Sequence, residues 1–114
     1  MKEKRSKISP YVFPGLPKIE KQSQLDRLMA IVVNTTGVSD AEIKGKSRAR
    51  ETVRARHLFF HFAREMPFSL RQIGVMAGGR DHSTVIHGSD SIKRLCECKD
   101  KYIAGMFAKI KQML

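Results

Sequence analysis

The sequence has no tryptophan, few acidic residues and only two cysteines, and it contains no long apolar run. Cys96 and Cys98 lie too close together for an ordinary disulfide, so nothing indicates an oxidising compartment. No segment approaches the roughly 18 apolar residues of a membrane span, and the N-terminal MKEKRSK is not followed by the apolar core of a signal peptide. We therefore expect a cytoplasmic protein that has no membrane partner.

Positive charge is what the sequence has in excess. Its 22 Lys and Arg residues outnumber its 11 Asp and Glu residues, and the resulting net charge of +11 predicts a polyanionic partner. The basic residues occur in several separate segments and not along one helix face bordered by Trp or Phe, which favours nucleic acid over a membrane surface. Nucleic acid is therefore the expected partner.

Residues 1–17 differ in composition from the rest of the chain. They begin with charged residues and contain three prolines and a glycine, which exclude a continuous helix. Tyr11, Val12, Phe13 and Leu16 are too apolar for a pure linker. We expect a basic N-terminal arm that lies on its own domain or docks a protein partner.

Residues 18–114 are predicted to form one domain of about six helices. Apolar residues recur at helical spacing over 18–35 and 51–66, and again in helices that begin near Asp81 and Asp100, whereas no segment alternates as a strand does. The middle segment is the expected core helix, with an apolar face made of Ala55, Leu58, Phe59, Phe62, Ala63 and Met66. The predicted fold is an all-α compact bundle without internal repeats.

Local signals place the two short helices of this bundle. Ser39 with Glu42 and Ser69 with Gln72 each have the spacing of a capping box, which marks the start of a helix. We expect Gly37 to end the first long helix. Gly45 is expected to end the helix after Ser39 in a left-handed conformation.

The stretch GGRDHSTVIHG, residues 78–88, carries the main functional signal. A short helix, a turn that contains glycine and a second helix that begins with polar residues have the layout of a helix-turn-helix, whose second helix lies in the DNA major groove. Asp81 can accept a hydrogen bond from a cytosine amino group, and His82, Ser83 and Thr84 can bind bases or phosphates. The alternative is an ordinary helix corner with a capping aspartate.

Two catalytic interpretations of this stretch fail on its residue pattern. A nucleotide-binding P-loop needs the pattern GxxxxGK[ST] after a strand, and both the lysine and the strand are missing. Asp81, His82 and Ser83 follow one another directly, so their helical side chains point about 100° apart and cannot form a nucleophilic triad. We expect no enzymatic activity, no nucleotide and no cofactor.

The segment from Lys44 to Arg56 holds six basic residues and one acidic residue. Arg48 lies between Gly45 and the predicted core helix, so it can reach a narrow minor groove, whose negative potential attracts arginine. Generic contact with phosphates, without any reading of groove shape, is the alternative.

Ile73 to Ile92, IGVMAGGRDHSTVIHGSDSI, resembles the signature of the C-terminal DNA-binding domain of the bacterial replication initiator DnaA. A weaker resemblance runs from Ile19 to Leu114. The resemblance to this family implies a helix-turn-helix bundle that binds short AT-rich DnaA boxes in double-stranded DNA. It also implies a protein that is associated with the nucleoid and regulates replication initiation or transcription. The initiator's nucleotide-binding domain has no counterpart here, so we expect a stand-alone DNA reader.

The resemblance also implies a role for individual residues. Asp81, His82 and Ser83 would contact bases in the major groove, and Arg48 would enter the minor groove. Contacts with the DNA backbone are expected from Arg50, Arg56, Arg64, Leu70, Arg71, Arg80 and Thr84. The chain departs from the family pattern at Arg71, Ala77, Gly88 and Ser91.

Two functions from other classes are weaker alternatives. His57 and His61 share a helix face at the spacing of two zinc ligands, but Leu58 stands where an HExxH metallohydrolase needs glutamate, so we expect no metal. The second alternative is a cationic adaptor whose arm docks a protein partner through Tyr11 to Leu16, with DNA contact secondary.

Overall fold

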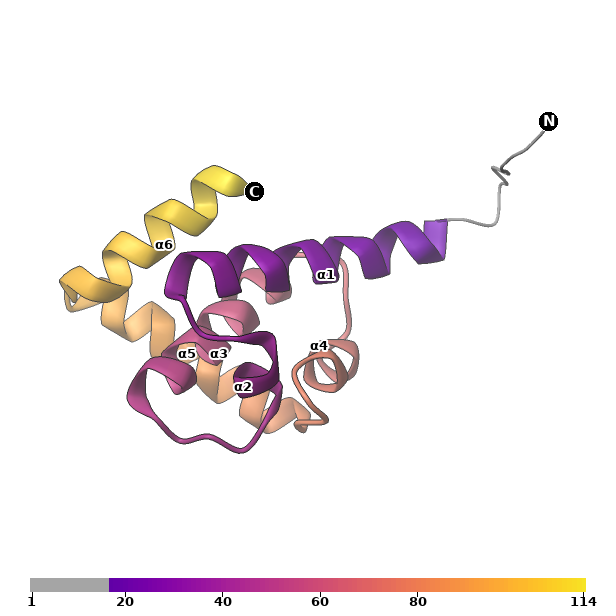
Figure 1. Ribbon diagram of the computed structural model, residues 1–114, viewed down its shortest axis with the longest axis horizontal. Helices are drawn as coiled ribbons and strands as arrows, with labels where there is room; N and C mark the ends of the chain where they lie inside the picture. Colours follow the sequence, from indigo (N-terminus) through magenta and orange to yellow (C-terminus); the bar gives the residue numbers. More distant parts are fainter. Residues whose placement is uncertain (1–16) are drawn as a thin grey trace.

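The computed structural model describes the backbone of residues 17–114 and the side chains of residues 24–114. The predicted arm lies outside this part of the chain except for Pro17, which is the first residue of a helix and not the end of the arm. The described residues form six helices and no strand, which confirms the predicted all-α bundle (Figure 1). The helices are α1 (Pro17–Thr36), α2 (Asp40–Lys44), α3 (Arg50–Arg64), α4 (Leu70–Met76), α5 (His82–Glu97) and α6 (Lys101–Met113).

Both predicted capping boxes are present. The hydroxyl of Ser39 accepts a hydrogen bond from the backbone N–H of Glu42 at 3.1 Å, and the Glu42 carboxylate accepts from the backbone N–H of Ser39. Ser69 and Gln72 repeat this arrangement at the start of α4. These reciprocal bonds satisfy N–H groups that have no acceptor within their own helix, which explains where α2 and α4 begin.

The two glycines expected to end helices behave differently. Gly37 follows α1 with a φ of +77°, a conformation that favours glycine. Gly45 ends α2 as predicted, but the predicted left-handed conformation is wrong, because its φ is −85° and its backbone is extended. The carbonyl of Gly45 accepts hydrogen bonds from the side chains of Arg56 and Arg80, so contacts from distant parts of the chain fix this residue.

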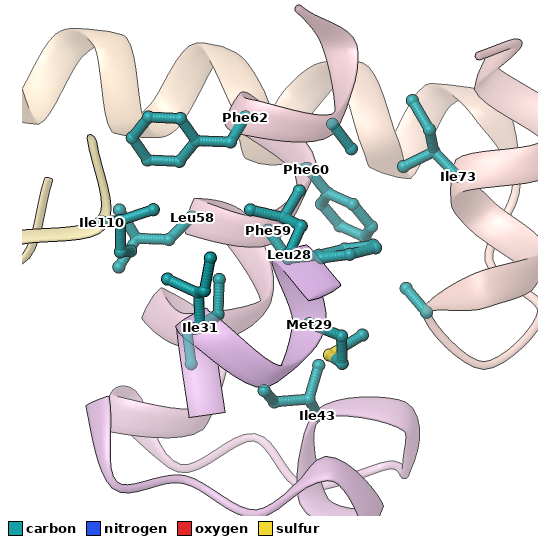
Figure 2. Packing of buried hydrophobic residues seen from close by; sticks show 14 of the residues in the cluster. Leu28, Met29, Ile31, Ile43, Leu58, Phe59, Phe60, Phe62, Ile73 and Ile110 are labelled. Carbon is teal, nitrogen blue, oxygen red and sulfur yellow. The ribbon is translucent and has the colours of Figure 1, made fainter. Parts of the chain in front are cut away.

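The core is built around α3. The expected face of α3 is buried as predicted, except that Met66, just beyond the helix, is only partly buried. Phe60 was not predicted in this set, yet it is fully buried beside Phe59. Figure 2 shows these two rings between Leu28 of α1 and Ile73 of α4. The helix therefore contributes more than one face to the core.

A close crossing joins α3 to α5. Gly88 of α5 is buried, and a Cβ atom at this position would lie 2.7 Å from ring atoms of both His57 and Phe60. Glycine at 88 therefore makes room for two aromatic rings of α3. This packing fixes α5 on the core.

The remaining long helices cover α3 from other sides. The helix α1 packs against α3 and α6, and α6 buries Ile103 and Ile110 while Phe107 is partly buried. Figure 1 shows α1 along one side of the bundle and α6 near the C-terminal end of α1. Among the described helices, none combines the length and apolar character that would let it cross a lipid bilayer.

Candidate nucleic-acid interface

The turn between α4 and α5 is fixed by its backbone. The carbonyl of Gly74 accepts hydrogen bonds from the N–H groups of Gly79 and Arg80, both at 2.9 Å. Gly78 and Gly79 have φ values of +98° and +83°, which only glycine adopts without strain. A Cβ atom on Gly74 would collide with the carbonyl of Arg80, and one on Gly78 with that of Lys44. The three glycines thus allow a turn that packs closely on α2.

The first turn of α5 presents polar side chains to solvent. Asp81 is the N-cap, and its Oδ1 accepts a hydrogen bond from the backbone N–H of Thr84 at 2.9 Å. This bond lowers the pKa of Asp81. His82, Ser83 and Thr84 are all exposed. The structure thus contains the capping aspartate, and it also places the predicted base-contacting residues together at the exposed start of the helix.

His87 belongs to this face but was not among the predicted contacts. It is exposed and lies four residues after Ser83, which places the two side chains on the same side of α5 one turn apart. The proximity of His87 also contributes to the lowered pKa of Asp81. The spacing from Ser83 was the sequence signal that could have identified it.

A hollow of about 330 Å³ lies between α4 and the start of α5. Arg71 and Val75 line it from α4, and Asp81 and His82 line it from the other side. Arg71 is exposed, and Leu70 is half-buried as the first residue of α4. Arg64 is exposed at the end of α3 and lies 3.7 Å from Asp90 of α5. Of these residues predicted to contact the DNA backbone, Leu70 and Arg71 thus lie on the first helix of the helix-turn-helix, and Arg64 lies beside its second helix.

The loop between α2 and α3 carries the predicted minor-groove residue. Arg48 and Arg50 are exposed, and no described residue forms an ion pair with either. In Figure 1 this loop forms an open curve on the same lower side of the view as the start of α5. The two predicted reading elements therefore lie on one side of the molecule.

The side chain of Arg56, which was expected to contact the DNA backbone, is turned toward the protein. Its side chain is only 6% exposed and turns into the loop that precedes its own helix. The Nε atom donates to the carbonyl of Ile43 at 2.8 Å, and Nη2 lies within 3.3 Å of the carbonyls of Glu42, Gly45 and Ser47. A DNA-backbone contact by Arg56 stays a prediction, and in the structure its guanidinium binds carbonyls at the end of α2 and in the following loop.

Arg80 is also turned toward the protein. Its side chain is partly buried, and its guanidinium donates to the carbonyls of Lys44, Gly45 and Ala77. These bonds join the turn of the helix-turn-helix to the end of α2. Burial lowers the pKa of Arg80, and burial together with the charge of Arg80 lowers that of Arg56. A direct phosphate contact by Arg80 stays a prediction, and its hydrogen bonds point inward.

The two histidines weighed as zinc ligands lie in aromatic surroundings. His57 stacks with Phe60 at a ring-centroid distance of 6.3 Å, and the ring of His61 lies 5.1 Å from that of Phe107. The Nε2 atom of His61 is buried, and the nearest carboxylate oxygen, on Glu65, is 3.6 Å away. Within residues 24–114, no three His, Cys, Asp or Glu side chains come together as a metal site would need.

Known proteins similar to this chain in sequence share one description. A family model described as the bacterial dnaA protein helix-turn-helix matches residues 25–92, from α1 into α5. The chain is similar to proteins named chromosomal replication initiator protein DnaA. The one from Lactobacillus helveticus is 35% identical over 92 residues, which cover 80% of this chain and 20% of the relative.

Other relatives with the same name give similar figures. The protein from Microcystis aeruginosa is 34% identical over 104 residues, covering 90% of this chain and 23% of its own length. The protein from Enterococcus faecalis is 42% identical over 74 residues, covering 64% and 16%. The chain therefore spans about a fifth of the length of the curated relatives it matches.

Proposed function

The chain belongs to the bacterial DnaA helix-turn-helix family, and on that premise we propose that it binds double-stranded DNA sequence-specifically at DnaA-box-like sites. The observation that carries the proposal is the exposed first turn of α5, where three side chains with base-binding chemistry follow a fixed glycine turn. The name of the relatives supports a role in replication initiation, and regulation of transcription is the other outcome that sequence-specific binding allows.

In this proposal α5 enters the major groove with its N-terminus leading. Asp81 keeps one carboxylate oxygen for its helix cap, and its other oxygen can accept a hydrogen bond from a cytosine amino group. His82 and Ser83 follow at the exposed start of the helix and contact base edges. Thr84 binds phosphate, because the partial positive charge of the helix N-terminus favours an anion there.

The DNA backbone is held on both sides of this helix. Arg64 and Arg71 are exposed cations beside α5, and the backbone N–H of Leu70 begins α4, where no earlier residue of the helix accepts from it. Arg50 provides a further cation at the start of α3. Because phosphates are the same in every sequence, these contacts supply affinity and orientation rather than base preference.

Arg48 reads a second groove in this proposal. It is exposed in the loop on the side where α5 begins, and its long cationic side chain suits the narrow minor groove of AT-rich DNA. The protein thereby contacts one site from two grooves. The AT-rich boxes implied by the family fit this arrangement, because the minor groove distinguishes chiefly A·T from G·C pairs.

The experiment that tests the proposal begins with selection of bound sequences from random duplex DNA. The selected box and a scrambled duplex of equal length are then titrated with the protein and with His82→Ala. If His82 contacts a base, its loss costs about 1–3 kcal/mol on the box and little on the scrambled duplex. Arg94→Ala serves as the control, because Arg94 is exposed at the opposite end of α5.

Two results would contradict the proposal. Selection that yields no enriched sequence would exclude specific recognition of duplex DNA. A His82→Ala variant that loses affinity in the same ratio on both duplexes would show that the start of α5 does not read bases. In that case the GGRDHST segment would be a capped helix corner only.

A further inference from the structure

One carbonyl joins the two proposed reading elements. The oxygen of Gly45 accepts hydrogen bonds from Arg56, which lies on α3, and from Arg80, which lies in the turn before α5. Gly45 itself begins the loop that carries Arg48. Two cationic side chains from different parts of the fold therefore converge on the backbone of this loop.

The two arginines bind different carbonyls of this loop and of the segments next to it. Arg56 holds the carbonyls on both sides of Gly45, and the last of these, Ser47, directly precedes Arg48. Arg80 bonds the carbonyls of Lys44 and Gly45 and also that of Ala77 within its own turn. The backbone is thus fixed up to the residue before Arg48 and tied to the helix-turn-helix at its other end.

Backbone packing brings the same two segments together independently. A Cβ atom at Gly78 would collide with the carbonyl of Lys44, so the glycine turn and the end of α2 are in direct contact. Gly78 also has a positive φ, which makes glycine doubly suited to this position. The Arg80 side chain lies at this contact, where a guanidinium can bind several carbonyls at once because its donors form a rigid fork.

We propose that Arg80 and Arg56 are positioning residues that hold the Arg48 loop at a fixed distance from the start of α5, so that the protein reads both grooves with one fixed spacing. This inference rests on the proposed function. A loop ordered before binding loses less conformational freedom on the DNA, so it binds more tightly at the spacing it fits. It also tolerates a changed spacing poorly.

The test uses Arg80→Gln and duplexes in which one base pair is inserted between the A·T segment contacted by Arg48 and the part read by α5. For the unaltered protein, we expect the insertion to lower affinity roughly tenfold, the size of a typical mismatch in a specific site. For Arg80→Gln, we expect lower affinity on the original box and a loss of only about twofold on insertion. Arg94→Ala should keep the tenfold loss.

A second readout follows Arg48 directly. Replacing the contacted A·T pair by G·C places an amino group in the minor groove, whereas replacing it by inosine·cytosine does not. The unaltered protein should lose roughly tenfold on G·C and little on inosine·cytosine. Arg48→Ala and Arg80→Gln should each abolish this difference, and the double variant should add nothing further. Arg80→Lys keeps the charge with fewer donors, so its loss of affinity on G·C relative to inosine·cytosine should lie between those of the unaltered protein and Arg80→Gln.

Three results would overturn the inference. If Arg80 instead holds a phosphate, Arg80→Gln will weaken binding to every duplex equally, reduce the salt slope by about one and keep the tenfold spacing penalty. If Arg80→Gln and Arg80→Lys fold, as judged by thermal unfolding, and both keep the unaltered spacing profile, the loop does not depend on this residue. If neither variant folds, Arg80 is a fold residue and not a positioning residue. An unaltered protein without preference for any duplex would refute the proposed function itself.

Discussion

The exposed arginines between the end of α2 and the first residue of α3 and the inward arginines beside them have the same chemistry but opposite surroundings. Arg48 and Arg50 extend into solvent, whereas Arg56 is buried and Arg80 half-buried among backbone carbonyls. Only the first pair is available to a polyanion as the structure stands. The difference shows that the net charge of +11 is shared between two tasks, contact with a partner and organisation of the surface that makes the contact.

The inward arginines can stay charged because carbonyl oxygens replace the water they lose. Burial lowers the pKa of Arg56, as does the nearby charge of Arg80. An arginine nevertheless keeps its proton in proteins, so the guanidinium remains a donor to the carbonyls around it. Hydrogen bonds to a charged group are stronger than neutral ones, which offsets much of the cost of burial.

The largest effect that this comparison predicts is on folding stability. Arg56→Met keeps much of the side-chain volume but removes the donors from four carbonyls, of which that of Ile43 is buried and the other three are partly buried. We expect the free energy of unfolding to fall by about 3 kcal/mol, because each buried polar group left without a partner costs about 1–3 kcal/mol. Urea unfolding followed by circular dichroism measures the change.

Arg48→Ala is the matched control for this measurement. It removes the same charge from the same segment, but from an exposed side chain, and should change stability by no more than about 0.5 kcal/mol. Equal losses of stability in the two variants would contradict the comparison, because they would mean that Arg48 and Arg56 differ in exposure but not in structural role.

A smaller effect is expected when an exposed arginine outside the loop is removed. Arg64→Ala should weaken binding to the selected box and to scrambled DNA by the same factor, about 1 kcal/mol on each. The slope of log affinity against log salt should fall by about one unit, since one phosphate contact is lost. Titrations of both duplexes at four salt concentrations measure the factor and the slope.

The ion pair of Arg64 with Asp90 makes this measurement more demanding. In the free protein the two side chains lie 3.7 Å apart, so DNA has to compete with Asp90 for the guanidinium. Asp90→Asn should therefore strengthen binding slightly on both duplexes if Arg64 holds a phosphate. A gain limited to the box would assign Arg64 to base recognition and remove it from the phosphate contacts.

Most of the fold could be predicted from the sequence because its signals are local. Helical spacing of apolar residues located the long helices, and two capping boxes located the starts of α2 and α4. The conformation of Gly45 could not be predicted in this way. Hydrogen bonds from arginines 11 and 35 residues farther along the chain determine it, and nothing in the neighbouring residues announces them.

The candidate site divides in the same manner. The start of α5 could be predicted because glycines, a capping aspartate and polar residues adjoin one another in sequence. The orientation of Arg56 was missed because charge alone does not show where a side chain points. A signal was present nonetheless: Thr52, Arg56, Phe59 and Ala63 follow one another at helical spacing, and all four are buried. The arginine thus lies within the buried stripe of α3.

Histidines show the same contrast between exposed and inward positions. His82 and His87 are exposed on α5, whereas His57 and His61 pack against aromatic rings at the core. Burial lowers the pKa of His57, with a further contribution from the charge of Arg56. Burial also lowers the pKa of His61, and Arg64 and Lys93 act in the same direction while Glu65 opposes them.

The smallest predicted effect is a pH dependence of stability that originates in the inward histidines. Because the pKa of His61 is lower in the folded protein than in the unfolded chain, the unfolded chain takes up the proton first as the pH falls. Stability should therefore be retained above about pH 6.5, the ordinary pKa of histidine, and decline below it until the folded form is also protonated.

Urea unfolding between pH 7.5 and 5 should show a shallower decline for His61→Phe, which keeps an aromatic ring against Phe107 without a titrating group. His82→Gln, which removes an exposed histidine, should leave the decline unchanged. If His82→Gln flattens the profile as much as His61→Phe does, the inward position of His61 is not the source of the pH dependence, and the contrast between exposed and inward groups does not extend to the histidines.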